Sequence, residues 1–280
     1  MRFTKMHGTG NDFILTEYEE IKSGSLSVSD IAKGICNRRV GVGADGFMFP
    51  MESRIADIKM KYYNSDGTKA EMCGNGIRCF ARYVYEGGKV ANRKFTIETD
   101  AGIYSVELIN KCMVEVKMGE ALIDAASVPA LGGREGKFLK EEIETRFGKI
   151  EVSSVRMGVP HTIVFEKGDK LFDVKKWGYE IEKMKGVFPE GTNVNFVKVL
   201  SPREISVETW ERGAGKTLSC GTGVCASAYL ARFFGVVDEN IDVKVPGGRL
   251  SIRMKGDSLY MKGEAVLICR GVFSMEKCNL

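Results

Sequence analysis

The chain has 280 residues, which is enough for one large domain or two domains of ordinary size with sizeable cores. Its formal net charge is +4, from 41 basic and 37 acidic residues dispersed along the sequence, which argues against a nucleic-acid partner. No apolar stretch approaches bilayer length, and the first residues lack the apolar core of a signal peptide. Eight cysteines are too few for a disulfide scaffold, so we expect reduced thiols and a cytoplasmic protein without membrane association.

Strands and glycine-rich turns fill the first part of the chain. Residues 3–15 have the pattern of two short strands separated by a turn at 8–11. Ser29 and Asp30 are expected to cap a short helix, and a glycine-rich loop over 39–46 leads into another strand. The next segment, 55–63, alternates apolar and polar residues, as a half-buried strand does.

A cysteine between polar and glycine-rich residues opens the first central helix. The sequence Met72-Cys73-Gly74-Asn75-Gly76 precedes a run over 77–85 whose apolar residues have helical spacing. Gly87-Gly88 is a plausible end of that helix. Strands are predicted next, at residues 95–98, 103–108 and 113–118. We expect the segment 119–149 to be irregular and to contain the domain boundary.

The second half of the chain repeats the first. Cys220-Gly221-Thr222-Gly223 opens a second apolar helix, and Cys220 follows Cys73 by 147 positions. The same offset separates Asn64 from Glu211 and Gly46 from Asn193, which indicates a duplication with a pseudo-twofold axis. The predicted fold class is α+β, with two pseudo-symmetric domains that each wrap a strand-rich sheet or barrel around one buried helix. The expected domains are residues 1–119, completed by 265–280, and residues 120–264.

The two repeated cysteines suit a particular chemistry. The unpaired amides of a helix start bind anions and lower the pKa of a thiol placed there. One thiolate can remove a proton from one face of a carbon while the opposite thiol delivers a proton to the other face. Two helix starts can stabilise the charge that develops on an amino acid's carboxylate. The pattern therefore predicts inversion of a stereocentre by Cys73 and Cys220 without cofactor or metal.

Other interpretations of the cysteines are weaker. The remaining six are expected to be packing residues, because cysteine is often buried. The spacings Cys73-x5-Cys79 and Cys220-x4-Cys225 are not those of common zinc sites. A hydrolase that pairs one cysteine with His161 would leave the second Cys-Gly-x-Gly unexplained, and His161 can equally be a structural histidine. No lysine has an obvious pyridoxal-phosphate context.

Three long motifs resemble the diaminopimelate epimerase family over nearly the whole chain. They run from Lys5 to Phe13, from Tyr63 through Cys73 to Cys79, and from Trp210 through Cys220 to Gly223. By this resemblance, the protein converts L,L-diaminopimelate to the meso form, in lysine and cell-wall precursor biosynthesis, without a cofactor. The resemblance makes Cys73 and Cys220 the base and acid pair, with Cys73 serving the L,L face and Cys220 the meso face.

The resemblance also implies binding residues. The backbone at Gly74-Asn75 and Gly221-Thr222 would hold the reacting carboxylate, and Glu211 would meet the reacting ammonium group. Arg212 would pair with the distal carboxylate through its two-donor fork. Further hydrogen bonds would come from Asn11, Asn64 and Asn193.

The sequence departs from the family's pattern at three positions. Val159, Gly46 and Lys216 stand where other members have Asn, Gln and Glu. We keep Val159, Gly46 and His161 as further candidate site residues. The runner-up function is a related cofactor-independent racemase with another amino-acid substrate. A non-catalytic small-ligand-binding protein would need only one helix start and no second thiol. A homodimer is a candidate assembly.

Overall fold

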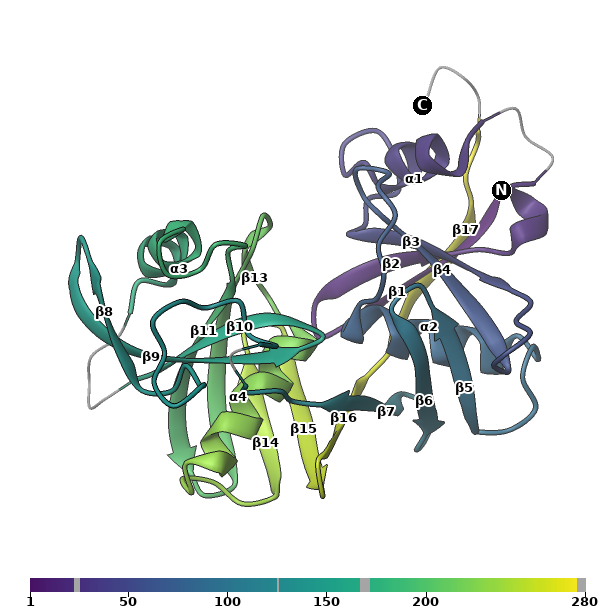
Figure 1. The fold of residues 1–280 in the computed structure, drawn as a ribbon. Coiled ribbons are helices and arrows are strands. Elements are labelled where there is room, and N and C mark those ends of the chain that lie inside the picture. The colour runs from purple at the N-terminus through teal and green to yellow at the C-terminus, as the bar shows by residue number, and fades with distance from the viewer. Residues whose placement is uncertain (23–25, 125, 167–171, 276–280) are drawn as a thin grey trace. The chain divides into compact units, whose positions relative to one another are not determined.

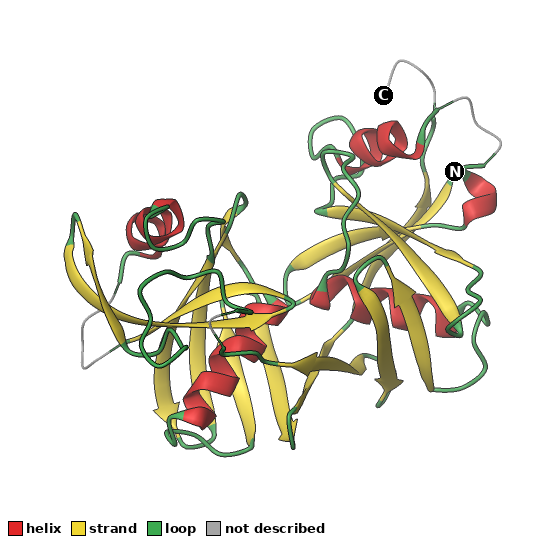
Figure 2. Ribbon diagram, viewed as in Figure 1, coloured by secondary structure: helices red, strands yellow, loops and turns green. Residues whose placement is uncertain are grey.

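The computed structural model describes residues 1–22, 26–124, 126–166 and 172–275 (Figure 1). The chain divides into two compact units. Unit 1 is Met1–Lys117 together with Lys262–Leu280, and unit 2 is Met118–Met261. In each unit, strands surround one central helix (Figure 2). Within the described ranges, no helix combines the length and apolar character that crossing a bilayer requires.

Unit 1 contains eight strands, two α-helices and a short 3-10 helix at Tyr18–Glu20. Its strands and α-helices are β1 (Arg2–Gly8), β2 (Asn11–Leu15), α1 (Val28–Cys36), β3 (Gly46–Met51), β4 (Ile58–Asn64), α2 (Gly74–Glu86), β5 (Lys94–Thr99), β6 (Gly102–Leu108), β7 (Met113–Glu120) and β17 (Val266–Val272). The last strand, β17, pairs antiparallel with β1, so both ends of the chain contribute to one sheet. β7 extends beyond the boundary of the unit.

Unit 2 repeats this plan. Its elements are β8 (Glu141–Thr145), β9 (Gly148–Met157), β10 (Val159–Phe165), α3 (Val174–Lys183), β11 (Asn193–Ser201), β12 (Glu204–Glu211), β13 (Gly215–Thr217), α4 (Gly221–Phe233), β14 (Asn240–Val245), β15 (Gly248–Lys255) and β16 (Ser258–Glu264).

The pairing order shows the duplication directly. In unit 1, β1–β2, β3–β4 and β5–β6 are antiparallel, while β2–β3 and β4–β5 are parallel. In unit 2, β9–β10, β11–β12 and β14–β15 are antiparallel, while β10–β11 and β12–β14 are parallel. Parallel strands need a crossover connection between them. Each of these crossovers contains a helix: α1 and α2 in unit 1, and α3 and α4 at the corresponding places in unit 2. The fold class predicted from the repeat is therefore confirmed.

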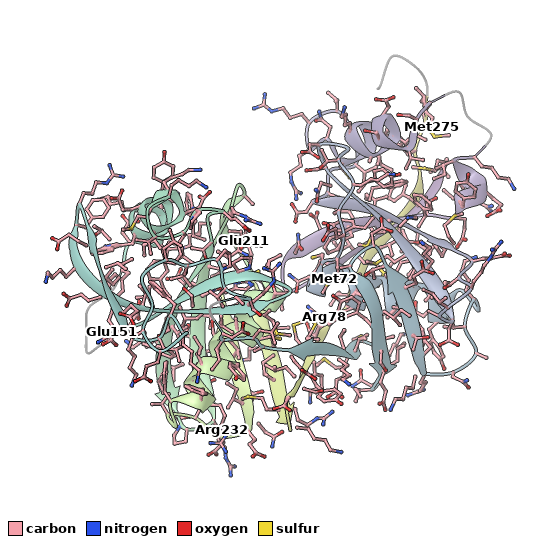
Figure 3. The ribbon with its side chains drawn as sticks, in the orientation of Figure 1. Met72, Arg78, Glu151, Glu211, Arg232 and Met275 are labelled. Atoms are coloured by element: carbon pink, nitrogen blue, oxygen red, sulfur yellow. The ribbon has the colours of Figure 1, made fainter. Side chains whose placement is uncertain are left out.

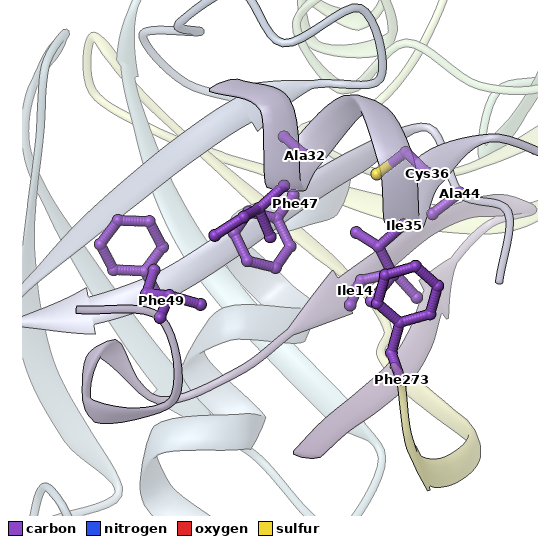
Figure 4. Packing of buried hydrophobic residues seen from close by; sticks show 10 residues of the cluster. Ile14, Ala32, Ile35, Cys36, Ala44, Phe47, Phe49 and Phe273 are labelled. Atoms are coloured by element: carbon purple, nitrogen blue, oxygen red, sulfur yellow. The ribbon is translucent and has the colours of Figure 1, made fainter. Parts of the chain in front are cut away.

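Alternation along the strands places one helix on each face of the unit 1 sheet. Ile14, Phe47 and Phe49 are buried in a cluster with α1, as Figure 4 shows. Their strand neighbours Phe13 and Met48 lie against the first turn of α2 on the other face. The strands that position α2 are therefore buried on both sides.

Two local expectations were wrong, and one helix was not predicted. The cap of α1 is Ser27, not Ser29: the Ser27 side chain accepts from the amide of Asp30, while the Ser29 hydroxyl donates to Gly67 O. The segment 119–149 is not irregular throughout, because β8 and the start of β9 form a hairpin there. Helix α3 was not predicted. It lies one repeat offset after α1 and has an apolar face of Val174 and Ile181.

Candidate active site

In unit 1, Cys73 is the residue before α2. Its backbone is extended, and its carbonyl accepts the first helical hydrogen bond from the amide of Ile77 at 2.8 Å. The amides of residues 74–76 therefore lie at the start of the helix, where no earlier turn supplies acceptors. Gly76 lies close to the sheet, since a Cβ there would lie 3.0 Å from Met48 Cε and 3.3 Å from Phe13 Cε1, so a larger residue would require these side chains to shift. This close approach fixes the start of α2, and thus Cys73, against the sheet.

Asn11, a second predicted site residue, contacts Cys73. The thiol of Cys73 donates to Asn11 Oδ1 at 3.4 Å, and Asn11 begins β2 next to the Gly8–Gly10 turn. Asn64 ends β4, where it pairs with Gly46 of β3, and its amide Nδ2 donates to Thr68 Oγ1 at 3.0 Å.

Gly46 has no room for a side chain. A Cβ at this position would lie 2.4 Å from Cε2 of Tyr62, whose ring also packs edge-on against Phe13. The Tyr62 ring therefore fills the space into which a side chain at 46 would extend.

Arg78 was not among the predicted site residues, yet it is fully buried below the start of α2 (Figure 3). Its guanidinium donates to Gly74 O at 3.0 Å, to Asn75 Oδ1 at 3.0 Å and to Glu264 O at 3.2 Å. The hydroxyl of Thr9 also donates to Asn75 Oδ1, at 3.0 Å. Arg78 thus joins the helix start to the first turn of the chain and to the segment that returns before β17.

In unit 2, Cys220 stands in the same position before α4 and is buried. Burial raises the pKa of its thiol well above the usual range, and the negative charge of Glu211 raises it further. Hydrogen bonds from Thr222 and from the amide of Gly223 oppose this shift. Cys220 is therefore protonated at neutral pH.

A line of buried polar side chains leads to Cys220. Thr209 Oγ1 donates to Asn195 Oδ1 at 3.0 Å, so the Asn195 amide nitrogen faces His161 Nδ1, at 3.1 Å. Nδ1 is then the acceptor, and His161 Nε2 carries the proton, which it donates to Thr222 Oγ1 at 3.1 Å. The Thr222 hydroxyl is left to donate to Cys220 Sγ, 3.5 Å away. His161 is thus part of the site and not an isolated structural histidine.

The repeat shows how unusual this line is. Asn195 follows Met48 by the same 147 positions, and His161 follows Phe13 by 148, the offset that also relates Val159 to Asn11, so the two residues correspond to Met48 and Phe13 of unit 1. In unit 1 both residues lie against Gly76, and in unit 2 a Cβ at Gly223 would lie 2.2 Å from Asn195 Oδ1 while His161 contacts Thr222 of the same helix start. The same structural positions are therefore apolar in unit 1 and polar in unit 2. The apolar pair of unit 1 shows that these positions can be packed without polar groups. We therefore infer that the polar pair of unit 2 has a function beyond packing.

His161 should make the stability of unit 2 depend on pH. Burial, and then the positive charge of Arg212, lowers the pKa of His161 to about 3 from its ordinary 6.5. Between these values the unfolded chain binds a proton at His161 and the folded chain does not, so the free energy of unfolding falls as pH decreases. We expect His161→Gln to reduce that slope by up to about 1.4 kcal/mol per pH unit.

Urea unfolding at a series of pH values from 7 to 4 measures this effect. Both tryptophans, Trp177 and Trp210, belong to unit 2, so their fluorescence reports its unfolding. Identical slopes for the parent chain and His161→Gln would contradict a histidine held neutral by burial.

The other predicted residues of unit 2 lie at strand ends near this line. Asn193 is buried, pairs with His161 in the sheet, and accepts the backbone amide of Arg212 at its Oδ1, 2.8 Å away. Arg212 is exposed and donates from Nη1 to Glu190 O at 2.7 Å. Glu211 ends β12 (Figure 3). Gly221 and Thr222 are the first residues of α4.

The two remaining departures from the family pattern are on the surface of unit 2. Val159 begins β10 with its side chain exposed, and this aliphatic group offers no hydrogen bond. Lys216 lies on β13, where its ammonium pairs with Glu208 of the adjacent strand at 2.5 Å.

The remaining cysteines are not all packing residues. Cys36, Cys79 and Cys225 are buried, and burial raises the pKa of both Cys36 and Cys79 to about 12. Cys112 is half-buried and Cys269 is exposed on β17, so the packing interpretation is wrong for Cys269. Cys278 lies outside the described residues. All the described cysteines are free thiols, and no cluster among the described residues could hold a metal.

Several residues of the site were missed in the sequence. Asn195 and Arg78 are buried polar side chains between apolar neighbours, and this contrast is the signal that could have identified them. Thr209 is also buried, but it follows Glu208 and gave no such signal. Asp45 and Arg38 gave no such signal, because a glycine-rich loop is polar in any case.

The fold defines a class of proteins built from two similar units, each with strands around a central helix. A probable proline racemase from Agrobacterium radiobacter K84 shares the fold, with a TM-score of 0.72 and 14% identity over 98% of this chain and 93% of that chain. The diaminopimelate epimerase family model matches residues 3–123 and 153–268.

Two relatives are similar to this chain in sequence as well. The diaminopimelate epimerase of Alkaliphilus metalliredigens (strain QYMF) is 44% identical over 98% of this chain and 97% of its own. That of Caldanaerobacter subterraneus subsp. tengcongensis is 45% identical over 97% of this chain and 98% of its own. The chain belongs to the diaminopimelate epimerase family.

Proposed function

We propose that this chain is an isomerase that inverts one α-carbon of diaminopimelate, between the L,L and meso forms, without a cofactor. In this role it serves lysine and cell-wall precursor biosynthesis. Membership of the family supports the reaction. The observation that carries the mechanism is the pair of thiols, Cys73 and Cys220, at the starts of the duplicated helices α2 and α4.

The proposed reaction has two proton transfers. One cysteine thiolate removes the α-proton, and the electron pair of the C–H bond stays on the substrate and spreads onto its carboxylate. The opposite cysteine, as a thiol, delivers its proton to the other face of the carbon. The helix-start amides at Gly74-Asn75 and Gly221-Thr222 are donors for the carboxylate in both steps, and they are fixed before the reaction begins.

The protonation of Cys220 supports a direction for this scheme. Since Cys220 is a thiol at neutral pH, it suits the acid that reprotonates the intermediate. Cys73 is then the base in this direction, which by resemblance to the family starts from the L,L isomer, and Cys220 is the base in the reverse direction. Glu211, whose charge disfavours the Cys220 thiolate, also strengthens that thiolate as a base once it forms.

Recognition of the distal end is part of the proposal. Arg212 would bind the distal carboxylate with two donors, and Glu211 would receive the reacting ammonium group. The exposed guanidinium of Arg212 and the buried amide of Asn193, which holds the Arg212 backbone, support this arrangement. Asn11 and Asn64 would add hydrogen bonds from unit 1.

A racemase with a different amino-acid substrate remains the second candidate. The observations that favour it are the exposed side chain of Val159, which offers no hydrogen bond, and the ring of Tyr62, which occupies the space beside Gly46. A homodimer and a cytoplasmic location also belong to the proposed function, and the free thiols support the second.

Exchange of the α-hydrogen in heavy water tests the function. The purified chain, without added pyridoxal phosphate or metal, is incubated with L,L-diaminopimelate, meso-diaminopimelate, and a panel of other amino acids. We expect deuterium incorporation and interconversion of the two diaminopimelate isomers, measured by mass spectrometry and chiral chromatography. Exchange that disappears with a chelator and returns with metal would contradict the cofactor-free mechanism. Exchange confined to another amino acid would establish the racemase alternative.

A further inference from the structure

The side-chain amide of Asn11 has only one chemically sound orientation. Its Nδ2 lies 2.5 Å from Asp45 Oδ2. A carboxylate can only accept hydrogen bonds, so the nitrogen of the amide has to face Asp45 and its carbonyl oxygen has to face away. That oxygen, Oδ1, is the atom that accepts the Cys73 thiol at 3.4 Å.

Asp45 is itself held from several directions. Its Oδ2 also accepts the backbone amide of Asp12 at 3.1 Å, and its own amide donates to Asp12 O at 2.9 Å. Its Oδ1 accepts from Arg38 Nη2 at 2.7 Å, and the same nitrogen donates to Asp12 Oδ1, also at 2.7 Å. Lys5 pairs with Asp12 from the adjoining strand, at 3.0 Å.

The loop that carries Asp45 is anchored by its backbone. The amides of Val42 and Gly43 both donate to Ile35 O at 2.9 Å, and the amide of Ala44 donates to Cys36 O at 3.1 Å. These bonds satisfy carbonyls at the end of α1 that would otherwise lack partners. The loop is therefore fixed to the helix, and Asp45 is set in place before any substrate arrives.

On the basis of the function proposed above, we propose that Asp45, bridged by Arg38, is a positioning residue that holds the Asn11 amide with its carbonyl oxygen toward Cys73. That oxygen accepts a hydrogen bond from the thiol and has none to offer the thiolate. When the Cys73 thiolate removes the substrate's α-proton, Cys73 becomes a thiol, and the Asn11 oxygen stabilises that thiol. The Cys73 thiolate is therefore a stronger base. A flipped amide would present its nitrogen to the sulfur and have the opposite effect.

The network exists only in the first repeat. By the repeat offsets, Asn11 corresponds to Val159 and Asp45 to Thr192. Cys220 is approached instead by the hydroxyl of Thr222. The two thiols thus have different hydrogen-bond partners: the amide oxygen of Asn11 at Cys73, and the hydroxyl of Thr222 with the carboxylate of Glu211 at Cys220.

A double-mutant cycle tests the proposal. Asp45→Asn keeps the shape of the side chain but lets it offer either an oxygen or a nitrogen, so the Asn11 amide can turn. We expect kcat to fall about tenfold with a smaller change in KM, since one oriented hydrogen bond is lost in the reacting state. In an Asn11→Ala background, Asp45→Asn should cause no further loss, because Asp45 acts through Asn11.

Alkylation gives a readout that does not need turnover. Each protein is treated with iodoacetamide at one fixed pH, and the rates at Cys73 and Cys220 are compared by peptide mass spectrometry. Asp45→Asn should raise the ratio of the Cys73 rate to the Cys220 rate, and this change should vanish in the Asn11→Ala background. Asp57→Asn is the matched control: it makes the same chemical change in unit 1, at an exposed carboxylate that caps Thr96 at the far end of β4.

The outcomes separate the two proposals. An unchanged alkylation ratio in Asp45→Asn, or an equal effect with and without Asn11, would overturn the positioning role. If the parent chain does not epimerise diaminopimelate, the proposed function fails while the alkylation cycle still tests Asp45. Should Asp45→Asn not fold, Arg38→Met loosens Asp45 from a largely exposed position, and we expect a smaller shift of the ratio in the same direction.

Discussion

Serine in place of either Cys73 or Cys220 is expected to reduce epimerisation of diaminopimelate by about a thousandfold or more. A hydroxyl is a far weaker base than a thiolate at neutral pH, and general acid–base catalysis typically contributes about a hundred- to ten-thousandfold. Cys269→Ser is the matched control, because it makes the same change at an exposed thiol on β17 and should leave the rate unaffected.

The division of labour between the thiols is tested by measuring each variant on each isomer. In a two-base mechanism, each cysteine is the base for one isomer and the acid for the other. Exchange of the α-hydrogen in heavy water should therefore persist at a low level on one isomer for Cys73→Ser and on the other isomer for Cys220→Ser. If Cys73 serves the L,L face, Cys220→Ser is the variant that retains exchange on L,L-diaminopimelate.

A one-base mechanism gives a different pattern. One variant would then be inactive on both isomers, and the other would remain largely active on both. That result would refute the central mechanistic claim, which is that the duplicated helix starts exist to present two opposed thiols.

Arg78→Met is expected to destabilise unit 1 by about 3 kcal/mol or more. The change leaves Gly74 O, Asn75 Oδ1 and Glu264 O without the guanidinium donors they now receive, and each buried unsatisfied polar group costs about 1–3 kcal/mol. Because Arg78 holds the first turn of α2, we also expect the loss to be concentrated around Cys73 rather than spread through the chain.

Hydrogen exchange of peptides from each helix start measures this effect. Protection should fall in the first turn of α2 and in β1, while the first turn of α4 in unit 2 keeps its protection. Arg203→Met is the control, since it removes an exposed ion pair with Asp238 that contributes about 1 kcal/mol or less. Equal loss of protection in α2 for the two variants would contradict the structural role of Arg78.

The duplication was the strongest signal in the sequence, and the fold class follows from it. An offset of 147 or 148 positions relates the glycine turns, the strand ends and the two cysteines, and the structure repeats the same order of parallel and antiparallel pairs. The local errors have local causes. Ser27 and Ser29 are both suitable caps, and only the position of Asp30 relative to Ser27 decides between them. Helix α3 was missed because its charged residues mask a short apolar face.

The polar partners of the thiols were much harder to predict. Asn195 lies in a strand whose neighbours are apolar, and its contact with His161 joins residues 34 positions apart. Asp45 reaches Asn11 across the same number of positions. Such contacts depend on the register of β2 against β3 and of β10 against β11, and a shift of one residue would turn each side chain to the opposite face.

The sequence by itself determined the family, the two-fold repeat, and the two cysteines at helix starts, because each of these is written in short segments whose residues are close along the chain. Tertiary structure alone decided how the two halves differ. Parallel pairing of β2 with β3 and of β10 with β11 puts Phe13 and Met48 under one helix, and His161 and Asn195 under the other. The physical reason is that strand register and the two-residue alternation of side chains bring distant residues together, and neither is encoded within a single segment.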